Sequence, residues 1–388
     1  MRPIDKNHPA AKNRLIYAKG RLNPLPNSLS GLFKIVPPFT RPLAFCAWTD
    51  FRAPKKISVD ESTYDFFKRR FGPDIAEYAV SSMLCGICAG SAKDISVKML
   101  FRTLFEAEQN HGSVIRGLPK EMKNKTPNVH NIQMGELSKK ATLERWSIYS
   151  FENGLETLPE CMEHMLREAK VKIRMSNPCV RINFSNDSVQ LELKSGDIIK
   201  SKNVICALPS ALLAPLLKED HPDLAQKLSE QQSVSVGVVN LKYKGRKTQS
   251  PAFGFLVPPI EQNPLLGVIF DSDCFENADG DTVLTAMMGG HWFHPQYTDK
   301  SPQDLADVAV ENIGKILGIK DDPVDVNPVI QKDCIPQYTV GHYERLDAID
   351  SYIEKHKLPL HLVGASYRGI GLNDVILSAK AAADKIMQ

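Results

Sequence analysis

The sequence has 388 residues, of which 43% are hydrophobic and 24% are charged. At roughly 150 residues per domain this length predicts two or three domains, and the composition can fill a hydrophobic core, which excludes a disordered or fibrous chain. The 48 Lys and Arg residues nearly balance the 45 Asp and Glu residues, for a formal net charge of +3. This balance excludes a protein that binds nucleic acid through bulk positive charge.

Neither a secretory signal nor a membrane span is predicted. Residues 1–6 contain no apolar run like the core of a signal peptide and no Arg- and Ser-rich amphipathic arm. No stretch reaches ~18 uninterrupted apolar residues, the length that spans a bilayer. We therefore expect a soluble or monotopic intracellular protein.

The eight cysteines are scattered, unlike the dense spacing of a disulfide-stapled domain. Only Cys85 and Cys88 form a C-x-x-C pair, and no second pair or H-x-H cluster follows to complete four zinc ligands. We therefore expect two half-buried thiols on one helical turn and no metal site.

An apolar segment near the N-terminus is interrupted by prolines and interleaved with basic residues. Pro37, Pro38 and Pro42 prevent one long helix there, so the segment predicts short helices. The residues concerned are Leu32, Phe33, Ile35, Val36, Phe39, Leu43, Phe45, Trp48 and Phe51, with Lys34, Arg41, Arg52, Lys55 and Lys56. Bulky apolar faces with basic flanks suit a membrane surface, and they also suit packing against the rest of the protein.

The middle of the chain predicts β-structure. Between residues 165 and 208 the apolar residues alternate with polar ones and turn residues separate the runs, which indicates a β-meander closed by a buried strand. The strands are expected at 171–174, 179–184, 188–193, 198–200 and 203–208, and further strands at 233–243, 253–270 and 282–292. The apolar spacing of residues 305–317 predicts an amphipathic helix.

The last 31 residues predict a strand at 358–363, a glycine-rich turn at 364–371 and a helix from Leu372. Apolar residues that recur every three or four positions give the helix one face, and its alanines allow close approach to a sheet. Asn373 or Asp374 can cap its first turn. Glycines bring backbone amides near a bound group, and a helix N-terminus carries about half a positive charge.

The turn could serve three functions. A dinucleotide fingerprint fails because its third glycine would fall on Asp374, after which only 14 residues remain. A hydrolase nucleophile elbow at Ser366 fails because Arg368 replaces the last glycine and no histidine follows His361. An amide-lined helix terminus facing an electron-rich cofactor and an ordinary strand–helix turn both stay open.

Residues 363–375, followed by the alanine-rich helix, resemble the C-terminal FAD motif of the protoporphyrinogen oxidases, a family of the FAD-dependent amine-oxidase superfamily. Other segments resemble the same family and occur in the family's order along the chain. These segments are residues 8–14, 145–147, 154–159, 236–241, 253–258, 288–292 and 334–342. The resemblance thus covers essentially the whole sequence.

The resemblance implies an oxidoreductase of haem biosynthesis that oxidises protoporphyrinogen IX to protoporphyrin IX through FAD. Six electrons pass to three molecules of oxygen and give three of hydrogen peroxide. The flavin carries this chemistry, so no side chain is expected to be catalytic. The family also implies peripheral attachment to the mitochondrial inner membrane and a homodimer, with no nucleic-acid partner.

The implied fold is α/β with α+β elements: an incomplete Rossmann-like FAD-binding domain, a mixed β-sheet substrate domain and a helical membrane-binding domain. The helical domain, with an edge of the substrate site, would occupy residues 1–125, and a substrate-domain segment residues 126–150. The FAD domain would take residues 151–212, which include the meander, and its last strand and helix residues 346–388. The substrate-binding domain would lie at residues 213–345.

Two groups of residues match site positions of the family. Those expected to contact FAD are Val180, Ala365, Ile370, Gly371 and Leu372. Those expected to bind substrate are Arg14, Gly86, Ala89, Phe253, Gly254, Leu256, Ile269 and Met287. In the family the position of Arg14 pairs with a propionate, and those of Leu256 and Met287 sandwich a ring. A guanidinium suits a propionate because it can donate two parallel hydrogen bonds.

The sequence departs from the family's pattern, and two alternative functions follow from these departures. The family's G-x-G-x-x-G turn, with an acidic residue ~20 positions later, is not found in this sequence, so we expect the chain to bind FAD weakly or not at all. A non-catalytic derivative that binds tetrapyrrole or partner subunits is therefore the second hypothesis. An amine oxidase ranks lower because Leu256 and Met287 offer no aromatic cage.

Overall fold

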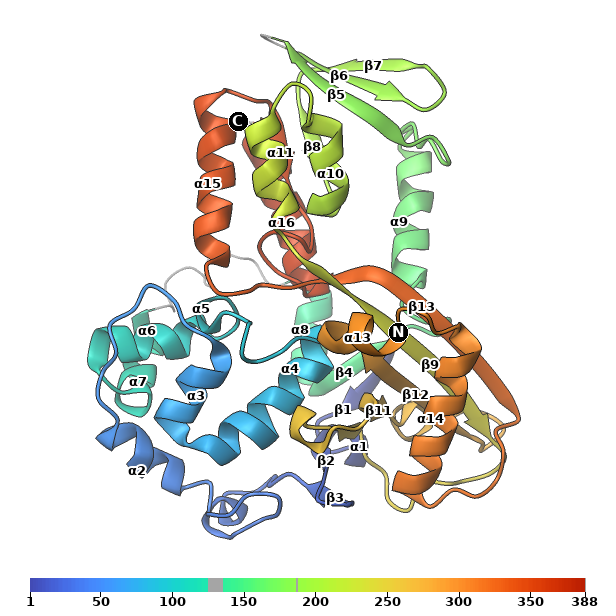
Figure 1. The fold of residues 1–388 in the computed structure, drawn as a ribbon. Helices are drawn as coiled ribbons and strands as arrows, with labels where there is room; N and C mark the ends of the chain where they lie inside the picture. The colour runs from blue at the N-terminus through green and yellow to red at the C-terminus, as the bar shows by residue number, and fades with distance from the viewer. Residues whose placement is uncertain (125–134, 186–187, 388) are drawn as a thin grey trace. The chain divides into compact units, whose positions relative to one another are not determined.

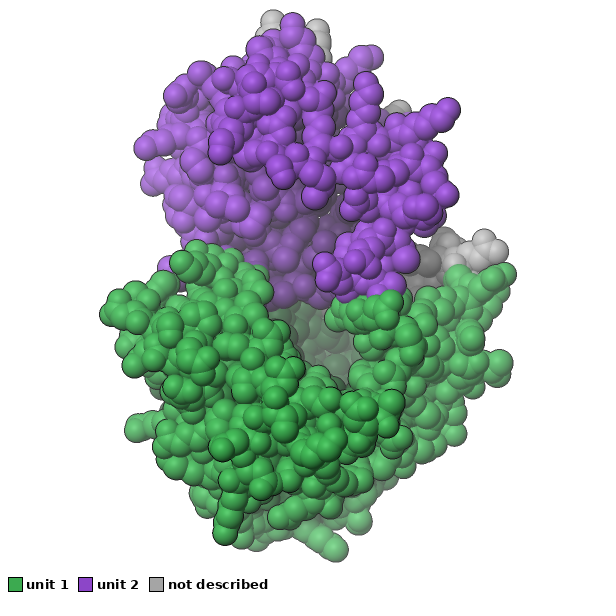
Figure 2. Space-filling model, turned by 90° about the vertical axis from the view of Figure 1, so that its right-hand side faces the viewer, with its two compact units in different colours: residues 1–155, 234–334 green, residues 156–233, 335–388 purple. Residues whose placement is uncertain are grey.

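The computed structural model describes residues 1–124, 135–185 and 188–387 (Figure 1). The chain forms two compact units, and each unit is assembled from two separate stretches of sequence (Figure 2). Unit 1 comprises Met1–Leu155 and Val234–Cys334, and unit 2 comprises Glu156–Ser233 and Ile335–Gln388. No described helix is long and apolar enough to cross a membrane.

Unit 1 is built on a mixed sheet of seven strands in the order β13-β9-β12-β11-β10-β2-β3. Their bounds are Leu15–Ala18 for β2, Arg21–Pro24 for β3, Ser233–Tyr243 for β9, Gly254–Leu256 for β10, Leu265–Ile269 for β11, Thr282–Gly289 for β12 and Asp325–Pro336 for β13. β10 runs parallel to β2, while β10–β11, β11–β12, β12–β9 and β2–β3 are antiparallel. The expected mixed sheet is therefore confirmed.

Helix α14 (Pro302–Leu317) covers this sheet in the region predicted to be helical. Its Leu305, Ala309 and Ile313 are fully buried against strand residues of β9 and β12. A capping box begins the helix, because Ser301 and Asp304 each bond the other's backbone amide. The short helix α13 (Phe293–Tyr297) joins the same core.

The rest of unit 1 is mostly helical. Its helices are α1 (Pro9–Lys12), α2 (Phe45–Arg52), α3 (Thr63–Phe71), the π-helix Ile75–Val80, α4 (Ser81–Cys88), α5 (Val97–Leu100), α6 (Arg102–His111), α7 (Val114–Asn124), α8 (Glu136–Leu143) and α12 (Asp271–Cys274). Strand β1 (Arg2–Asp5) pairs with β4 (Trp146–Ser150). The proline-interrupted segment forms two short helices, the 3₁₀-helix Ser30–Phe33 and α2, as predicted.

A buried ionic cluster ties α2, α3 and α6 together. Arg70 of α3, Asp50 of α2 and Glu108 of α6 all have fully buried side chains. Arg70 pairs with both acids, and Arg69 adds a second guanidinium to Glu108 at 2.6 Å. Asp50 also accepts from the amide of Ile115 at 2.9 Å, which fixes the start of α7. Such a cluster is costly to break, because removing one partner leaves an uncompensated buried charge.

The described residues of unit 2 form two small sheets and five helices. The meander β5 (Cys179–Ser185), β6 (Ser188–Leu193) and β7 (Ile198–Ser201) is antiparallel, and β8 (Val204–Cys206) pairs in parallel with β14 (Leu360–Leu362). The helices are α9 (Thr157–Glu168), α10 (Ser210–Leu217), α11 (Pro222–Ser229), α15 (His342–Lys355) and α16 (Leu372–Met387). The core of the unit joins α10, α11 and α15 to these sheets, with Leu213, Leu224 and Ile349 fully buried.

Three predictions were wrong. The strand expected at 203–208 forms only at Val204–Cys206 as β8, and it pairs with β14 instead of closing the meander. Residues 171–174 form no strand, although they alternate: Val171 is 47% exposed, and the observed meander begins only at Cys179. The thiols of Cys85 and Cys88 are buried rather than half-buried, with 3% and 1% exposure on α4. Burial raises the pKa of Cys85 to about 12 and that of Cys88 to about 11, so both stay protonated at neutral pH.

Candidate functional site

The glycine turn between β14 and α16 is held by one phenol. The hydroxyl of Tyr338 donates to the carbonyl of Ala365 at 2.5 Å and accepts from the amide of Gly369 at 2.9 Å. One side chain thus joins both halves of the turn. Burial raises the pKa of Tyr338 to about 12, although the amide of Gly369 acts in the opposite direction. The phenol therefore stays protonated and can keep donating at neutral pH.

Two further side chains fix the centre of the turn. The Nε2 atom of His342 lies 2.7 Å from the carbonyl oxygen of Tyr367, and Ser366 Oγ accepts from the amide of Ser210 at 3.3 Å. Tyr367 is buried, and its hydroxyl donates to the carbonyl of Leu208 at 3.4 Å. The backbone of the turn is therefore specified by contacts to α10, α15 and the segment before α15.

The start of α16 requires glycines and exposes backbone amides. A Cβ atom at Gly369 would lie 2.3 Å from the Cβ of Asp374, so only glycine fits there. Within the described residues, no hydrogen bond is found for the amides of Leu372 and Asn373, as is usual in a first helical turn. Leu372 is 48% exposed and Ile370 is half-buried beside these amides.

Val180 occupies a β-bulge. The register of β5 against β6 shifts between Cys179 and Arg181, so Val180 has no partner on β6. A bulge leaves the backbone groups of its extra residue outside the ladder. The Val180 side chain is also 47% exposed. Val180 therefore lies outside the regular pairing of β5 with β6 and is partly open to solvent.

Arg14 lies just before β2 in unit 1. Its guanidinium carbon lies 5.0 Å from the centroid of the Phe253 ring. The Phe253 amide donates to the carbonyl of Asn13 at 2.9 Å, and the Asn13 side chain donates to the carbonyl of Pro251 at 2.9 Å, so the two segments are tied on both sides. Arg14 is exposed and forms no ion pair with any carboxylate in the described ranges.

The sheet of unit 1 gathers most of the other predicted substrate residues. Leu256 lies opposite Gly267, which lies opposite Met287, so the two bulky side chains share a face with a glycine between them. A Cβ at Gly86 of α4 would lie 2.6 Å from Leu256 Cδ2, which shows how closely this helix approaches the sheet. Leu256 and Met287 are only partly buried. They therefore form an accessible apolar floor.

Three remaining residues flank this floor. Gly254 lies opposite Ile269, and its φ of 140° and a Cβ position only 2.1 Å from the Val268 carbonyl oxygen require glycine. Ala89 ends α4 in the left-handed region with φ 49°, and its carbonyl accepts from the amide of His291 at 2.8 Å. All eight predicted substrate residues lie in unit 1 and all five predicted FAD residues lie in unit 2.

A polar chain beside the floor was not predicted. The side-chain amide of Asn240 donates to Thr285 Oγ1 at 2.8 Å, and the Thr285 hydroxyl donates to Asp271 Oδ2 at 2.7 Å. Burial raises the pKa of Asp271, although the hydrogen bond from Thr285 lowers it in part. Neither this chain nor the network of Tyr338 and His342 has a sequence signal of its own, because periodicity does not reveal which polar side chains meet across strands. Only the family-like segment 334–342 pointed to Tyr338.

The sequence is similar to known proteins. A family model described as flavin containing amine oxidoreductase matches residues 5–387. The chain is 34% identical over 391 residues to the protoporphyrinogen oxidase of Homo sapiens, covering 99% of this chain and 81% of that protein. It is 29% identical to the protoporphyrinogen oxidase of Schizosaccharomyces pombe, covering 99% and 80%.

Among solved structures, a putative protoporphyrinogen oxidase from Exiguobacterium sp. 255-15 matches with a TM-score of 0.75 and 21% identity. The match covers 100% of this chain and 81% of that chain. At this identity the likeness establishes the fold. It confirms the α/β architecture with a mixed sheet that the sequence predicted.

Proposed function

The chain belongs to the flavin containing amine oxidoreductases and, among them, to the protoporphyrinogen oxidases, and from this premise we propose that it oxidises protoporphyrinogen IX to protoporphyrin IX with FAD and molecular oxygen. The observation that carries the proposal is the 34% identity over 99% of the chain to a protein of that name. An oxidoreductase of this kind takes six electrons from its substrate in three two-electron oxidations, each of which reduces one oxygen to hydrogen peroxide.

The residues of unit 2 fit FAD. The exposed amides at Gly371 and Leu372 and the half-buried side chains of Ala365 and Ile370 suit a flat ring that gains negative charge, since a helix N-terminus stabilises an anion. The unpaired backbone of Val180 suits the adenine end. When bound, FAD supplies the redox chemistry, and the protein supplies binding and orientation.

We propose that the substrate lies on the apolar floor of unit 1. Leu256 and Met287 would contact a pyrrole ring, while Gly86 and Ala89 leave space beside them. Arg14 would pair with a propionate, and its freedom from described carboxylates supports this role. Phe253, Gly254 and Ile269 complete the proposed walls.

The functional division of the chain is likewise a proposal. We assign residues 1–125 to a membrane-facing domain, 126–150 and 213–345 to the substrate domain, and 151–212 and 346–388 to the FAD domain. The boundary at 125 and 126 lies outside the described residues. A homodimer at the mitochondrial inner membrane completes the proposal. Cross-linking and fractionation of mitochondria test these two points.

Peripheral membrane attachment is supported by exposed apolar side chains within residues 29–59. Leu29, Phe33, Ile35 and Ile57 are between 62% and 84% exposed. Exposed apolar clusters of this kind mark interaction surfaces. Flotation of the protein with phospholipid vesicles tests the attachment, and a chain that stays at the bottom of the gradient with every vesicle composition contradicts it.

The activity is tested by oxygen uptake. The purified chain is mixed with added FAD and protoporphyrinogen IX, and oxygen consumption and porphyrin fluorescence are followed together. We expect three molecules of oxygen consumed for each porphyrin formed, above the rate of the same mixture without protein. Porphyrin binding without added oxygen uptake would instead support a non-catalytic tetrapyrrole binder.

A further inference from the structure

The surface around α2 carries an unusual balance of charge. Residues 29–59 contain five basic residues and a single acidic residue, Asp50. Asp50 is fully buried and is neutralised by Arg70. All five basic residues are exposed, and among the residues that the structure describes only Lys56 pairs with an acid, Glu61 at 2.9 Å. All the exposed charges of this segment are therefore positive.

Three arginines lie over three exposed aromatic rings of α2. The guanidinium carbons of Arg41, Arg52 and Arg116 lie 5.2, 5.2 and 4.9 Å from the ring centroids of Phe45, Trp48 and Phe51, respectively. The rings recur every third residue on the helix and are 42%, 54% and 42% exposed. None of the three guanidinium groups forms an ion pair with an acid that the structure describes. Each is free to meet an anion.

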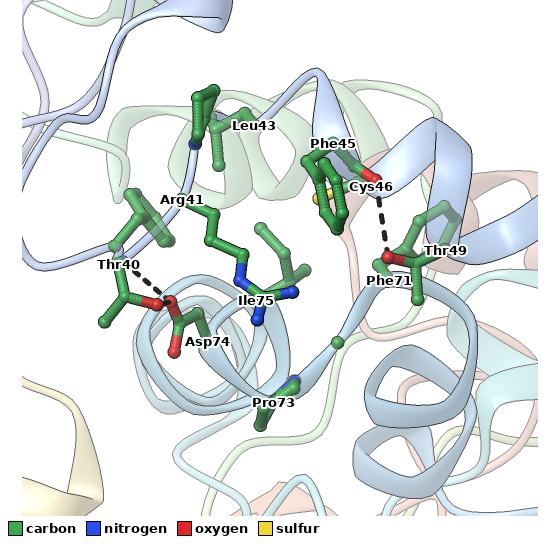
Figure 3. A pocket seen from close by; sticks show the side chains of 13 residues that line it. Thr40, Arg41, Leu43, Phe45, Cys46, Thr49, Phe71, Pro73, Asp74 and Ile75 are labelled. Atoms are coloured by element: carbon green, nitrogen blue, oxygen red, sulfur yellow. Dashed lines mark hydrogen bonds between the residues drawn. The ribbon is translucent and has the colours of Figure 1, made fainter.

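The backbone around Arg41 is fixed. The amide and hydroxyl of Thr40 both donate to Asp74 Oδ2, at 2.7 and 2.5 Å. Figure 3 shows the Arg41 side chain in a pocket between α2 and the segment after α3, with Asp74 bound to Thr40. The volume of this pocket is about 190 Å³. The Asp74 carboxylate already accepts two hydrogen bonds from Thr40. The Arg41 guanidinium lies over the Phe45 ring instead of pairing with this carboxylate.

A ligand that fits this surface must offer both an apolar region and negative charge. A second copy related by a two-fold axis would place these cations against one another, which is unfavourable. A nucleic acid would not use the exposed aliphatic side chains of Leu29, Ile35 and Ile57. A bilayer with anionic headgroups meets both needs, because its phosphates lie just above the depth that Trp and Phe side chains occupy. With eight residues, α2 is too short to span and suits the interface plane.

We propose that this surface, called the α2 face and formed by Leu29, Phe33, Ile35, Phe45, Trp48 and Phe51 with Lys34, Arg41, Arg52, Lys55 and Arg116, recognises anionic lipid. The rings enter the boundary between headgroups and acyl chains, and the arginines donate bidentate hydrogen bonds to headgroup phosphates. The proposal rests on the peripheral membrane attachment proposed above and adds to it a selection by charge.

The test compares two vesicle compositions. The full chain is co-sedimented with phosphatidylcholine vesicles and with vesicles in which a quarter of the lipid is phosphatidylglycerol. We expect at least about a hundredfold stronger partitioning into the anionic vesicles at about 0.1 M salt, and loss of this preference when salt is raised severalfold. The triple variant Arg41→Gln/Arg52→Gln/Arg116→Gln should lose roughly fivefold per removed charge on anionic vesicles only.

Matched variants separate charge from apolar contact. Lys194→Gln/Lys200→Gln/Lys202→Gln removes the same charge from exposed positions of unit 2 and should leave partitioning unchanged. Phe33→Ser/Trp48→Ser should weaken binding to both kinds of vesicle. Far-ultraviolet circular dichroism of each variant verifies the fold.

The two proposals fail differently. Equal partitioning into both vesicle types overturns the charge selection and leaves peripheral attachment standing. Absence of binding to either vesicle overturns both. A lipid-free dimer that the arginine triple variant dissociates, observed by analytical ultracentrifugation, would assign the α2 face to a second copy and overturn the lipid proposal.

Discussion

Tyr338 connects two backbone groups that are 2.5 and 2.9 Å from its hydroxyl and that no strand or helix pairs. Tyr338→Phe removes this hydroxyl and leaves the Ala365 carbonyl and the Gly369 amide without it. A lost partner for a buried polar group costs about 1–3 kcal/mol. We expect urea unfolding to show a loss in that range, together with weaker FAD binding in a fluorescence titration.

The control for Tyr338 is Tyr149→Phe, which removes a hydroxyl from a side chain that is 41% exposed. This variant should change neither the free energy of unfolding nor the affinity for FAD. If Tyr338→Phe behaves like Tyr149→Phe, the phenol does not organise the turn.

Arg14 is expected to act on substrate affinity. Hydrogen bonds to a charged group contribute about 1.5–3 kcal/mol, so Arg14→Gln should raise the KM for protoporphyrinogen roughly tenfold or more and affect kcat less. Steady-state oxygen uptake measures both constants. Arg21→Gln on β3 removes a guanidinium that is also exposed and should leave KM unchanged. A kcat effect without a KM effect would remove Arg14 from the propionate site.

Some residues of the candidate site could be predicted from the sequence and others could not. Gly86, Leu256 and Met287 were found by resemblance, and the structure brings them together through Gly267. The hydrogen bonds of Tyr338 and Asp271 were not predicted, since they join residues 27 and 14 positions apart. Such contacts depend on how elements pack, and no local pattern encodes them.

At the scale of elements, the buried ionic cluster of α2, α3 and α6 makes stability depend on pH. Burial alone would raise the pKa of Glu108, but hydrogen bonds from Arg69 and Arg70 outweigh it and lower this pKa to about 2. The ordinary value is 4.5. Because the folded state holds the ionised form more strongly, the stabilisation is complete above about pH 5 and is lost as pH falls from 4.5 towards 2.

We therefore predict that Glu108→Gln flattens the acid side of the stability profile. The difference in unfolding free energy between wild type and Glu108→Gln should be largest at neutral pH and shrink between pH 4.5 and 2, as measured by denaturant titrations at several pH values. Glu311→Gln, which removes an exposed partner of Lys315, should give a nearly constant small difference. A pH-independent gap for Glu108→Gln would contradict the shifted pKa.

Strands were predicted correctly where an alternating segment has neighbouring strands with which to pair. Ser233–Tyr243 was predicted residue for residue, because it alternates and lies between β12 and β13. Strand β13 was missed because Pro328 interrupts it, yet β13 is an edge strand, where a missing amide donor is tolerated. Residues 171–174 failed for the opposite reason: alternation alone forms no strand without a neighbour.

At the scale of the whole molecule, burial is uneven. Helix α16 has no buried side chain along its 16 residues, and Ile376 and Leu377 are 46% and 60% exposed. Helix α9 likewise has no buried side chain. In unit 1, by contrast, Val239, Leu284 and Ala286 of the central strands are fully buried. Segments with few buried apolar contacts open at lower free energy than core strands.

This difference predicts the order of hydrogen exchange. Amides of residues 375–383 in α16 should exchange well before those of residues 236–241 in β9, as followed by mass spectrometry of peptides from the intact chain. Added FAD should slow exchange in residues 364–380 and leave β9 unchanged, since a ligand stabilises the state to which it binds by RT ln(1 + [L]/Kd). Riboflavin at the same concentration lacks the adenine end and should protect less. Slow exchange of α16 without FAD would mean that its exposed face is already stabilised, and protection confined to other segments would place the flavin away from the glycine turn.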